Sequence, residues 1–521
     1  MSEVTSTSRS AATDPTVPTT HLYERSTMEI GSLIRNAARQ FQDAPALECD
    51  GRIVSFREFD EATDRVGNAL LAEGLAPGDR VGVMLPNGIE CLVVYYALAK
   101  SGLVRVALNE KDTAEANAYK IDDAGCRGII HTGLAPTDGA TVSMVGDYDW
   151  IESTAWQGPA QPCYVPRDPE APYRLGYTGG TTGKSKAVTL TMRGESAEVA
   201  AFLMDLMPDI GPGETMLHAA PIIHASGAFF LPSLARGASN RIITKFDPGL
   251  WLEEIERSRA SHSFLVPTMI ALVLDTPNVE DVDSSSLRRL CWGASPIPPS
   301  VAERAQSVFG KVLAQTYGQA EAPMAISVLT PEEHVRIGSA GRPYTLMEVG
   351  VMDEEGRFLD PGEHGEVVAR GQVLMKGYWN RPDLTEKAIR DGWLHTGDIG
   401  YLDSDGYLYL VDRMNDKIIS GGSNVYPREV EDVLNAHPAV REAAVVGIPD
   451  ETWGELVHAV VAVRQDVSEQ EILDFVSERL PRYAKPRSVE IWPELPKSHA
   501  GKILRRTVKE RETERLHGTS S

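Results

Sequence analysis

The sequence predicts an α/β fold in which a large N-terminal domain is followed by a small α+β domain. The large domain is expected to contain two layered α/β subdomains and a β-rich subdomain. Two observations support this. The 521 residues exceed what one hydrophobic core normally holds, so two or more domains are expected. In addition, strand-like and helix-like stretches alternate until about residue 338, where short β-like runs replace them.

The alternation is clearest in residues 79–132. The strand-like runs there are 80–85, 103–108 and 128–131, and the helix-like stretches between them are 89–100 and 113–124. This order is typical of a parallel sheet with crossover helices. It returns over residues 214–316 and predicts the second α/β subdomain.

After Gly338, alternating apolar runs at 347–352 and 365–370 are separated by turn sequences, which indicates a β-rich subdomain. Mixed strand and helix patterns from about residue 413 predict the small domain. The expected boundaries are a disordered leader at 1–22, an N-terminal domain at 23–412, a connecting segment at 413–417, a small domain at 418–509 and a flexible tail at 510–521.

Charge and cysteine content exclude several classes of protein. With 51 Lys and Arg against 74 Asp and Glu, the net charge is −23, which argues against nucleic acid or an anionic membrane as a general partner. No apolar run approaches the roughly 20 residues that a membrane span needs. Five cysteines without paired spacing predict neither a disulfide framework nor a zinc site, and favour a cytoplasmic protein. Monomer and homodimer both remain open.

The most informative stretch is residues 177–186, YTGGTTGKSK. Its glycines let backbone N–H groups approach an anion, its threonines add donors and its lysines add positive charge, as a polyphosphate site requires. A Walker A loop needs four residues between its first glycine and Gly-Lys-Ser, and here Gly179 and Gly183 enclose three. A flexible linker is the alternative, but strand-like runs at 173–177 and 187–190 flank the stretch.

Further motifs follow in a fixed order. They are PIIHASG (221–227), WGASP (292–296), YGQAE (317–321), HTGD (395–398), DR (412–413), GGSNVYPREVE (421–431) and PKSHAGKI (496–503). Together with the glycine-rich loop, this set resembles the acyl-adenylate-forming superfamily, which includes acyl- and aryl-CoA synthetases, luciferases and nonribosomal peptide adenylation domains. The resemblance spans nearly the whole chain.

The resemblance implies a reaction in two halves. A carboxylate attacks the α-phosphorus of ATP to give an acyl-adenylate and pyrophosphate, and a nucleophile then displaces AMP. It implies ATP, Mg²⁺ and coenzyme A as cofactors or co-substrates. The implied nucleotide-binding residues are Thr178, Gly179, Gly180, Thr181, Thr182, Gly183, Lys186, Gly293, Ala294, Ser295, Tyr317, Gly318, Gln319, Ala320, Asp398 and Arg413.

Within this set, Asp398 is expected to accept both ribose hydroxyls and Tyr317 to stack on adenine. The implied catalytic residues are Lys502, which bridges the carboxylate and the α-phosphate, His224, and Glu321, which binds magnesium. The implied acyl pocket contains His224, Ser226, Phe230, Ala294, Gln319 and Met324, and its small and apolar character favours an aryl or medium-length hydrophobic acid. His218 is expected to be structural.

The family's small domain rotates between the half-reactions about a hinge, here Asn415, where the family has Asp or Lys. The implied acceptor site contains Gly421, Gly422, Trp453, Tyr483, Lys485 and Arg487. These residues favour an acid–CoA ligase. An amide bond synthetase that passes the adenylate to an amine, and an enzyme that loads a carrier-protein thiol, remain open. Ala320 and Gly179 replace the family's threonine and serine, and with Asn415 they also keep open a nucleotide-binding protein with little turnover.

Overall fold

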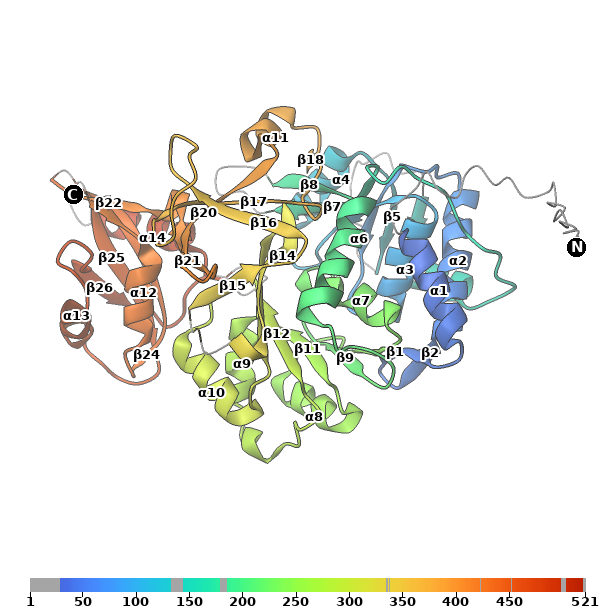
Figure 1. Ribbon diagram of the computed structural model, residues 1–521, viewed down its shortest axis with the longest axis horizontal. Helices are drawn as coiled ribbons and strands as arrows, with labels where there is room; N and C mark the ends of the chain where they lie inside the picture. The colour runs from blue at the N-terminus through green and yellow to red at the C-terminus, as the bar shows by residue number, and fades with distance from the viewer. Residues whose placement is uncertain are drawn as a thin grey trace, which may run out of the picture.

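The computed structural model describes residues 29–132, 144–178, 185–333, 336, 338–421, 423–450, 452–497 and 503–518. The expected leader lies outside these residues. Figure 1 shows a large body, running from the blue N-terminal helices to the yellow strands, with a smaller orange-to-red unit at the opposite end. No helix in the described ranges combines the length and apolarity that crossing a membrane requires.

The first sheet has the order β18-β8-β7-β4-β3-β5-β6. Its strands are β3 (Arg80–Met84), β4 (Val104–Ala107), β5 (Cys126–His131), β6 (Met144–Gly146), β7 (Pro172–Thr178), β8 (Lys186–Thr191) and β18 (Gly377–Tyr378). The expected parallel arrangement is confirmed, since β3 pairs in parallel with both β4 and β5. Strands β7 and β8 form the antiparallel hairpin that carries the glycine-rich loop.

The helices of this subdomain are α1 (Ile30–Phe41), α2 (Phe56–Ala72), α3 (Ile89–Lys100), α4 (Ala114–Ala124) and α5 (Tyr148–Ala155). Every residue of α3 is buried, as expected of a helix that is apolar on all sides and packs against α1, α2 and α5. The Lys100 ammonium at its end donates to Asp60 and Asp64 of α2, which compensates the buried charge.

The second sheet has the order β16-β17-β20-β21-β15-β14-β13-β12-β11-β9-β10-β1-β2, with β19 paired to β20. Its strands are β1 (Pro45–Cys49), β2 (Arg52–Ser55), β9 (Thr215–His218), β10 (Ser239–Ile242), β11 (His262–Leu265), β12 (Arg289–Gly293), β13 (Leu313–Gln319), β14 (Ala322–Leu329), β15 (Ser339–Pro343), β16 (Met347–Met352), β17 (Gly365–Gly371), β19 (Ile389–Arg390), β20 (Trp393–Leu402) and β21 (Leu408–Arg413). Strands β10, β9, β11, β12 and β13 are parallel, and the pairing becomes antiparallel from β14 onward. The expected β-rich subdomain is therefore continuous with the second α/β subdomain.

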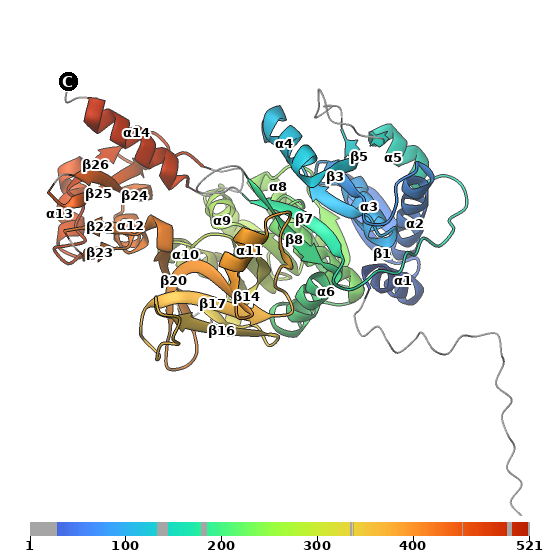
Figure 2. The same cartoon turned by 90° about the horizontal axis from the view of Figure 1, so that it is seen from above.

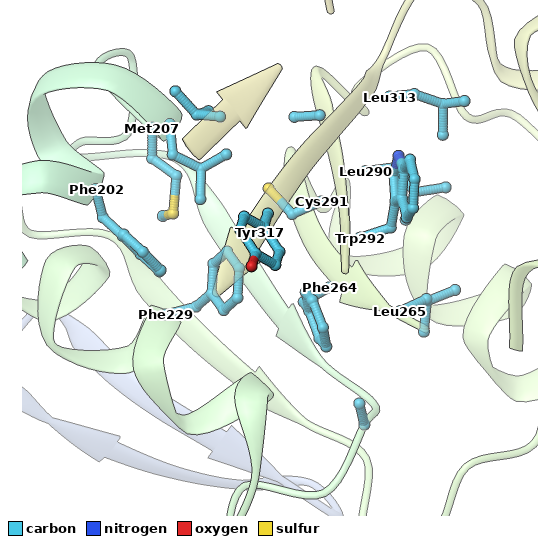
Figure 3. Close-up of a cluster of buried hydrophobic side chains, with 14 of the residues drawn as sticks. Phe202, Met207, Phe229, Phe264, Leu265, Leu290, Cys291, Trp292, Leu313 and Tyr317 are labelled. Carbon is cyan, nitrogen blue, oxygen red and sulfur yellow. The ribbon is translucent and has the colours of Figure 1, made fainter. Parts of the chain in front are cut away.

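The helices associated with this sheet are α6 (Met192–Ala201), α7 (Phe230–Ala235), α8 (Pro248–Ser258), α9 (Pro267–Leu274), α10 (Pro299–Phe309) and α11 (Pro382–Ala388). Its core gathers large aromatic side chains beneath the ends of β12 and β13. Figure 3 shows Phe202, Phe229 and Phe264 grouped around Tyr317, whereas Trp292 lies apart from them beside Leu290 and Leu313.

The small domain contains β22 (Ile418–Ser420), β23 (Ser423–Val425), β24 (Val440–Asp450), β25 (Gly454–Val463), β26 (Ser488–Ile491), α12 (Pro427–Asn435), α13 (Glu469–Ser477) and α14 (Arg505–Gly518). Helices α12 and α13 pack on one face of its sheet and α14 on the other, as Figure 2 shows. The expected α+β composition is confirmed.

The C-terminal segment differs from the flexible tail expected at 510–521. Helix α14 continues to Gly518, because Val508 packs on the β24 and β25 side chains and Glu512, only 1% exposed, lies 3.0 Å from the buried His458 ring. Most of the side chains around Val508 and Glu512 are charged, so the sequence indicated only weakly that this segment forms a packed helix.

A four-residue ion cluster joins α14 to the segment expected to act as the hinge. The Arg505 guanidinium donates to both carboxylate oxygens of Glu431 at 2.8 and 2.5 Å, to Asp412 at 3.1 Å and to Asp416 at 3.0 Å. Asp412 ends β21 of the large body, whereas Arg505 and Glu431 belong to the small domain. Arg505 therefore connects the two sides of the expected hinge.

Replacing Arg505 tests the energetic weight of this cluster. Arg505→Met should reduce the protection of α12 and α14 against amide hydrogen exchange by about 3 kcal/mol, because Glu431 and Asp412 lose their shared cation while buried. The control is Arg506→Met, whose exposed pair with Glu510 should contribute less than about 1 kcal/mol. Equal effects of the two variants would contradict the role given to Arg505.

Candidate active site

The WGASP, YGQAE and HTGD motifs lie together, where β12 and β13 end and on β20, beside the β7–β8 hairpin. Close packing fixes this region. A Cβ on Gly293 would lie 2.4 Å from the Thr316 carbonyl oxygen, and one on Gly318 would lie 2.4 Å from the Met324 nitrogen. Ala294 and Met324 have positive φ angles of 69° and 50°, and such backbone strain is often found at binding sites.

Asp398 forms the centre of the first polar cluster. Its Oδ2 accepts hydrogen bonds from the Tyr317 hydroxyl at 2.5 Å and from the Gln319 amide at 2.8 Å. Its Oδ1 lies 2.8 Å from Nε of Arg413. Burial, followed by the charge of Asp398, raises the pKa of Tyr317 well above its usual value, so its hydroxyl remains a donor. The carboxylate that is expected to bind ribose is therefore held in place from both sides.

Glu321 forms the centre of the second cluster. Its Oε1 accepts a hydrogen bond from the Tyr378 hydroxyl at 2.6 Å and lies 4.0 Å from the Lys186 ammonium. The Lys186 ammonium also lies 3.8 Å from the centre of the Tyr378 ring. Partial burial lowers the pKa of Lys186, and the nearby Glu321 charge acts in the opposite direction.

The histidines expected near the acyl pocket have different environments. His218 is completely buried, with Nε2 3.0 Å from Asn240 Oδ1 and Nδ1 3.1 Å from the Ser226 hydroxyl. Its burial supports the structural role expected for it. His224 is exposed, and its Nε2 lies 3.5 Å from the side-chain amide of Asn109. Of the two imidazole rings, only that of His224 is open to solvent.

Phe230 differs from the expectation that it lines an acyl pocket. Its side chain is 0% exposed and stacks on Tyr96 at a centroid distance of 5.0 Å, within the core beneath α1 to α3. Phe230 was expected in the pocket from its position after the PIIHASG motif, whereas its aromatic partners Phe59 and Tyr96 lie on helices distant in the sequence. Ala294 is exposed, and Gln319 and Met324 are partly exposed.

Several expected site residues lie outside the described residues. They are Gly179, Gly180, Thr181, Thr182, Gly183, Gly422, Lys502 and the side chain of Asn415. Both ends of the glycine-rich loop are described, and the Ser185 hydroxyl donates to the Thr178 carbonyl at 2.6 Å. This bond joins the two ends of the loop at its base.

The small domain presents an aromatic and cationic surface. Trp453 and Tyr483 are 44% and 51% exposed, and the Arg487 guanidinium lies 5.0 Å from the Trp453 ring centre. The Gly421 N–H donates to the Trp453 carbonyl, and a Cβ on Gly421 would lie 2.5 Å from the Trp453 ring. Of the expected acceptor-site residues, Trp453, Arg487 and Gly421 are therefore in mutual contact; Lys485 is partly exposed.

The chemistry of these groups fits a magnesium nucleotide. Asp398 offers two acceptor oxygens, Arg413 and Lys186 offer positive charge, and Glu321 offers the hard oxygen that Mg²⁺ prefers. In the described part of the chain, no group of three or more His, Cys, Asp or Glu is arranged to hold a metal alone. A single carboxylate suits an ion that also binds phosphates and water, as Mg²⁺ commonly does at nucleotide sites.

Comparison with known proteins identifies the family. Residues 34–379 match the model of the AMP-binding enzyme family, and residues 429–502 match its C-terminal domain. The chain belongs to the AMP-binding, adenylate-forming enzyme family. A feruloyl-CoA synthase from Amycolatopsis is 36% identical over 92% of this chain and 99% of that protein. A medium/long-chain fatty acid–CoA ligase of Mycobacterium tuberculosis is 35% identical over 94% of this chain and 90% of that protein.

Among solved structures, the amide bond synthetase McbA from Marinactinospora thermotolerans is 31% identical, with a TM-score of 0.85. The match covers 92% of this chain and 99% of McbA. Similarity to McbA therefore extends through both domains.

The sequence did not point to Tyr378 or Asn109 as members of the site. Tyr378 lies 57 residues after Glu321, and only the pairing of β18 with β8 brings its hydroxyl to the carboxylate. Asn109 follows β4 and lies 115 residues before its partner His224. The one available signal was the position of Asn109 just beyond the end of a parallel strand, where ligand-binding residues often occur.

The burial of His218 predicts a pH dependence of stability. Burial lowers its pKa from 6.5 to about 4, so between these values the unfolded chain binds a proton that the folded chain does not. Stability should be fully present above about pH 6.5 and fall by roughly 3 kcal/mol as pH decreases to about 4. Denaturant unfolding at several pH values measures this loss. His218→Gln should flatten the profile, and an unchanged slope would contradict the assignment.

Proposed function

We propose that this chain is an ATP-dependent carboxylic acid–CoA ligase that uses Mg²⁺. Family membership makes it an ATP-dependent ligase that releases AMP. The observation that carries the proposal is that each of two carboxylates has a cation nearby: Arg413 lies 2.8 Å from Asp398, and the Lys186 ammonium lies 4.0 Å from Glu321. This arrangement supplies separate acceptors for ribose hydroxyls and for a divalent cation.

In the first half-reaction, Asp398 binds the ribose, and Lys186 and the Thr178 hydroxyl bind phosphate oxygens at the glycine-rich loop. Glu321 would hold the metal ion, which would supply positive charge against the repulsion between the incoming carboxylate and the triphosphate. Lys502 donates to the carboxylate and the α-phosphate, stabilising the charge that develops there. The exposed His224 lies beside the acid and orients its carboxylate.

In the second half-reaction, a thiol displaces AMP from the acyl-adenylate. The surface formed by Trp453, Tyr483 and Arg487 suits coenzyme A, because aromatic faces stack on adenine and cations pair with phosphates. For this step the small domain rotates about Asn415. The rotation moves Lys502 away from the site and brings the surface around Trp453 to it.

The acid that we propose is aryl or medium-length and hydrophobic. Ala294 and Met324 offer small and apolar groups at the site, and relatives named as feruloyl-CoA and medium/long-chain fatty acid–CoA ligases act on such acids. The second candidate is an amide bond synthetase, favoured by the 31% identity to McbA.

The proposal is tested by the products that form from a panel of acids, ATP and Mg²⁺. We expect acid-dependent exchange of pyrophosphate into ATP, and acyl-CoA when coenzyme A is present. Amide formation from amines with no thioester would favour the second candidate. The absence of exchange with every aryl and alkyl acid would rule out both and leave a nucleotide-binding protein with little turnover.

Lys502→Ala should separate the half-reactions. We expect adenylate formation to slow by at least about 10²-fold, because the transition state loses a charged donor, while thioester formation from a supplied adenylate is largely retained. The matched control is Lys497→Ala, which removes a surface ammonium that pairs with Glu442 and should leave both rates within about threefold. Equal losses of both half-reactions in Lys502→Ala would contradict the division of roles.

A further inference from the structure

We propose that Tyr378 is a positioning residue that sets both the magnesium carboxylate and the phosphate-binding lysine before the nucleotide binds. Its hydroxyl donates to Glu321 at 2.6 Å, and its ring lies 3.8 Å from the Lys186 ammonium. The two groups that must bind a metal ion and a phosphate therefore contact different parts of one side chain.

The hydroxyl acts on Glu321 alone. The Glu321 side chain is 13% exposed, so its carboxylate has little water to hold it in one orientation. Within the described residues, the hydrogen bond from Tyr378 engages Oε1, and no side chain donates to Oε2. A carboxylate fixed at one oxygen and open at the other is preorganised to bind a cation, which reduces the cost of ordering it on binding.

The ring acts on Lys186. Its ammonium is 4.0 Å from Glu321 Oε1, beyond direct hydrogen bonding, and it rests on the negative face of the aromatic ring. Without the ring, the flexible lysine could move to the carboxylate and form a direct ion pair. That pair would occupy both groups needed by the magnesium nucleotide, so the ring keeps Lys186 and Glu321 apart.

The backbone explains why Tyr378 can hold both groups. Strand β18 pairs with β8, which begins at Lys186, and the Lys376 and Trp379 N–H groups donate to Thr189 and Ala187 on either side of the pair. The Met375 N–H donates to the Glu321 carbonyl at 2.8 Å. The segment carrying Tyr378 is thereby bonded to both the phosphate-loop strand and the turn bearing the carboxylate. Tyr378 itself is 7% exposed.

This inference rests on the proposed function, which assigns Glu321 to magnesium and Lys186 to phosphate. It is tested by calorimetric ATP binding to the full chain, with and without Mg²⁺, in two variants. Tyr378→Phe should leave the Kd for ATP without Mg²⁺ within about twofold and raise the Kd with Mg²⁺ about tenfold, since it removes only the bond to Glu321. Tyr378→Leu should raise both Kd values, the first by about threefold or more, since Lys186 also loses the ring.

Two controls accompany these variants. Tyr407→Phe removes another tyrosine hydroxyl that donates to a carboxylate, Glu333 at 2.7 Å, and should change neither Kd. In Glu321→Gln, Mg²⁺ should no longer lower the Kd for ATP as it does in the parent protein. Circular dichroism should show that each variant keeps the secondary-structure content of the parent protein.

The Kd changes in these variants separate a failure of the positioning role from a failure of the proposed function. Two results for Tyr378→Phe count against the positioning role: Kd values for ATP equal to those of the parent, or a Kd raised equally with and without Mg²⁺. If either result is found while Glu321→Gln loses the effect of Mg²⁺ on the Kd, the positioning role is wrong and the magnesium site stands. If the parent binds no ATP, or Glu321→Gln keeps the full response, the proposed function fails and the positioning role fails with it.

Discussion

The proposed nucleotide site depends on how its two carboxylates, Asp398 and Glu321, are held. Asp398 accepts a hydrogen bond from Tyr317 at 2.5 Å and Glu321 accepts one from Tyr378 at 2.6 Å, and each has a cation nearby, Arg413 or Lys186. Bare carboxylates would repel a triphosphate. In a chain of net charge −23, the overall field cannot offset that repulsion, so compensation has to be local.

The fold provides this arrangement by joining three parts of the chain that lie far apart in sequence. Tyr317 lies near the end of β13 beside aromatic core residues, Asp398 lies on the antiparallel extension of the same sheet, and Tyr378 belongs to a two-residue strand of the other sheet. Tight backbone contacts at Gly293 and Gly318 fix the first of these parts. The site therefore requires both sheets to be complete, whereas the acceptor surface around Trp453 belongs to the small domain alone.

The sequence predicted those features that depend on neighbouring residues, namely helix limits and motif residues. The limits of the all-apolar α3 were readable because its residues are helix-compatible and end at a buried Lys100, and the ordered motifs indicated Asp398, Glu321 and Tyr317. Long-range pairings were not readable: nothing near Tyr378 indicates that β18 reaches β8, and the helical course of α14 depends on Val508 and Glu512 meeting β24 and β25. The complete burial of Phe230 was not readable for the same reason, since its partners lie on distant helices.

The central claim is that Asp398, held by Tyr317 and Arg413, is the acceptor for the ribose hydroxyls. The most direct test compares the binding of ATP and of 2′,3′-dideoxy-ATP to the parent and to Asp398→Asn by calorimetry. The account predicts that the parent prefers ATP by at least about tenfold and that Asp398→Asn binds the two nucleotides alike, because hydrogen bonds to a charged acceptor are lost together. A preference for ATP that survives in Asp398→Asn would contradict it.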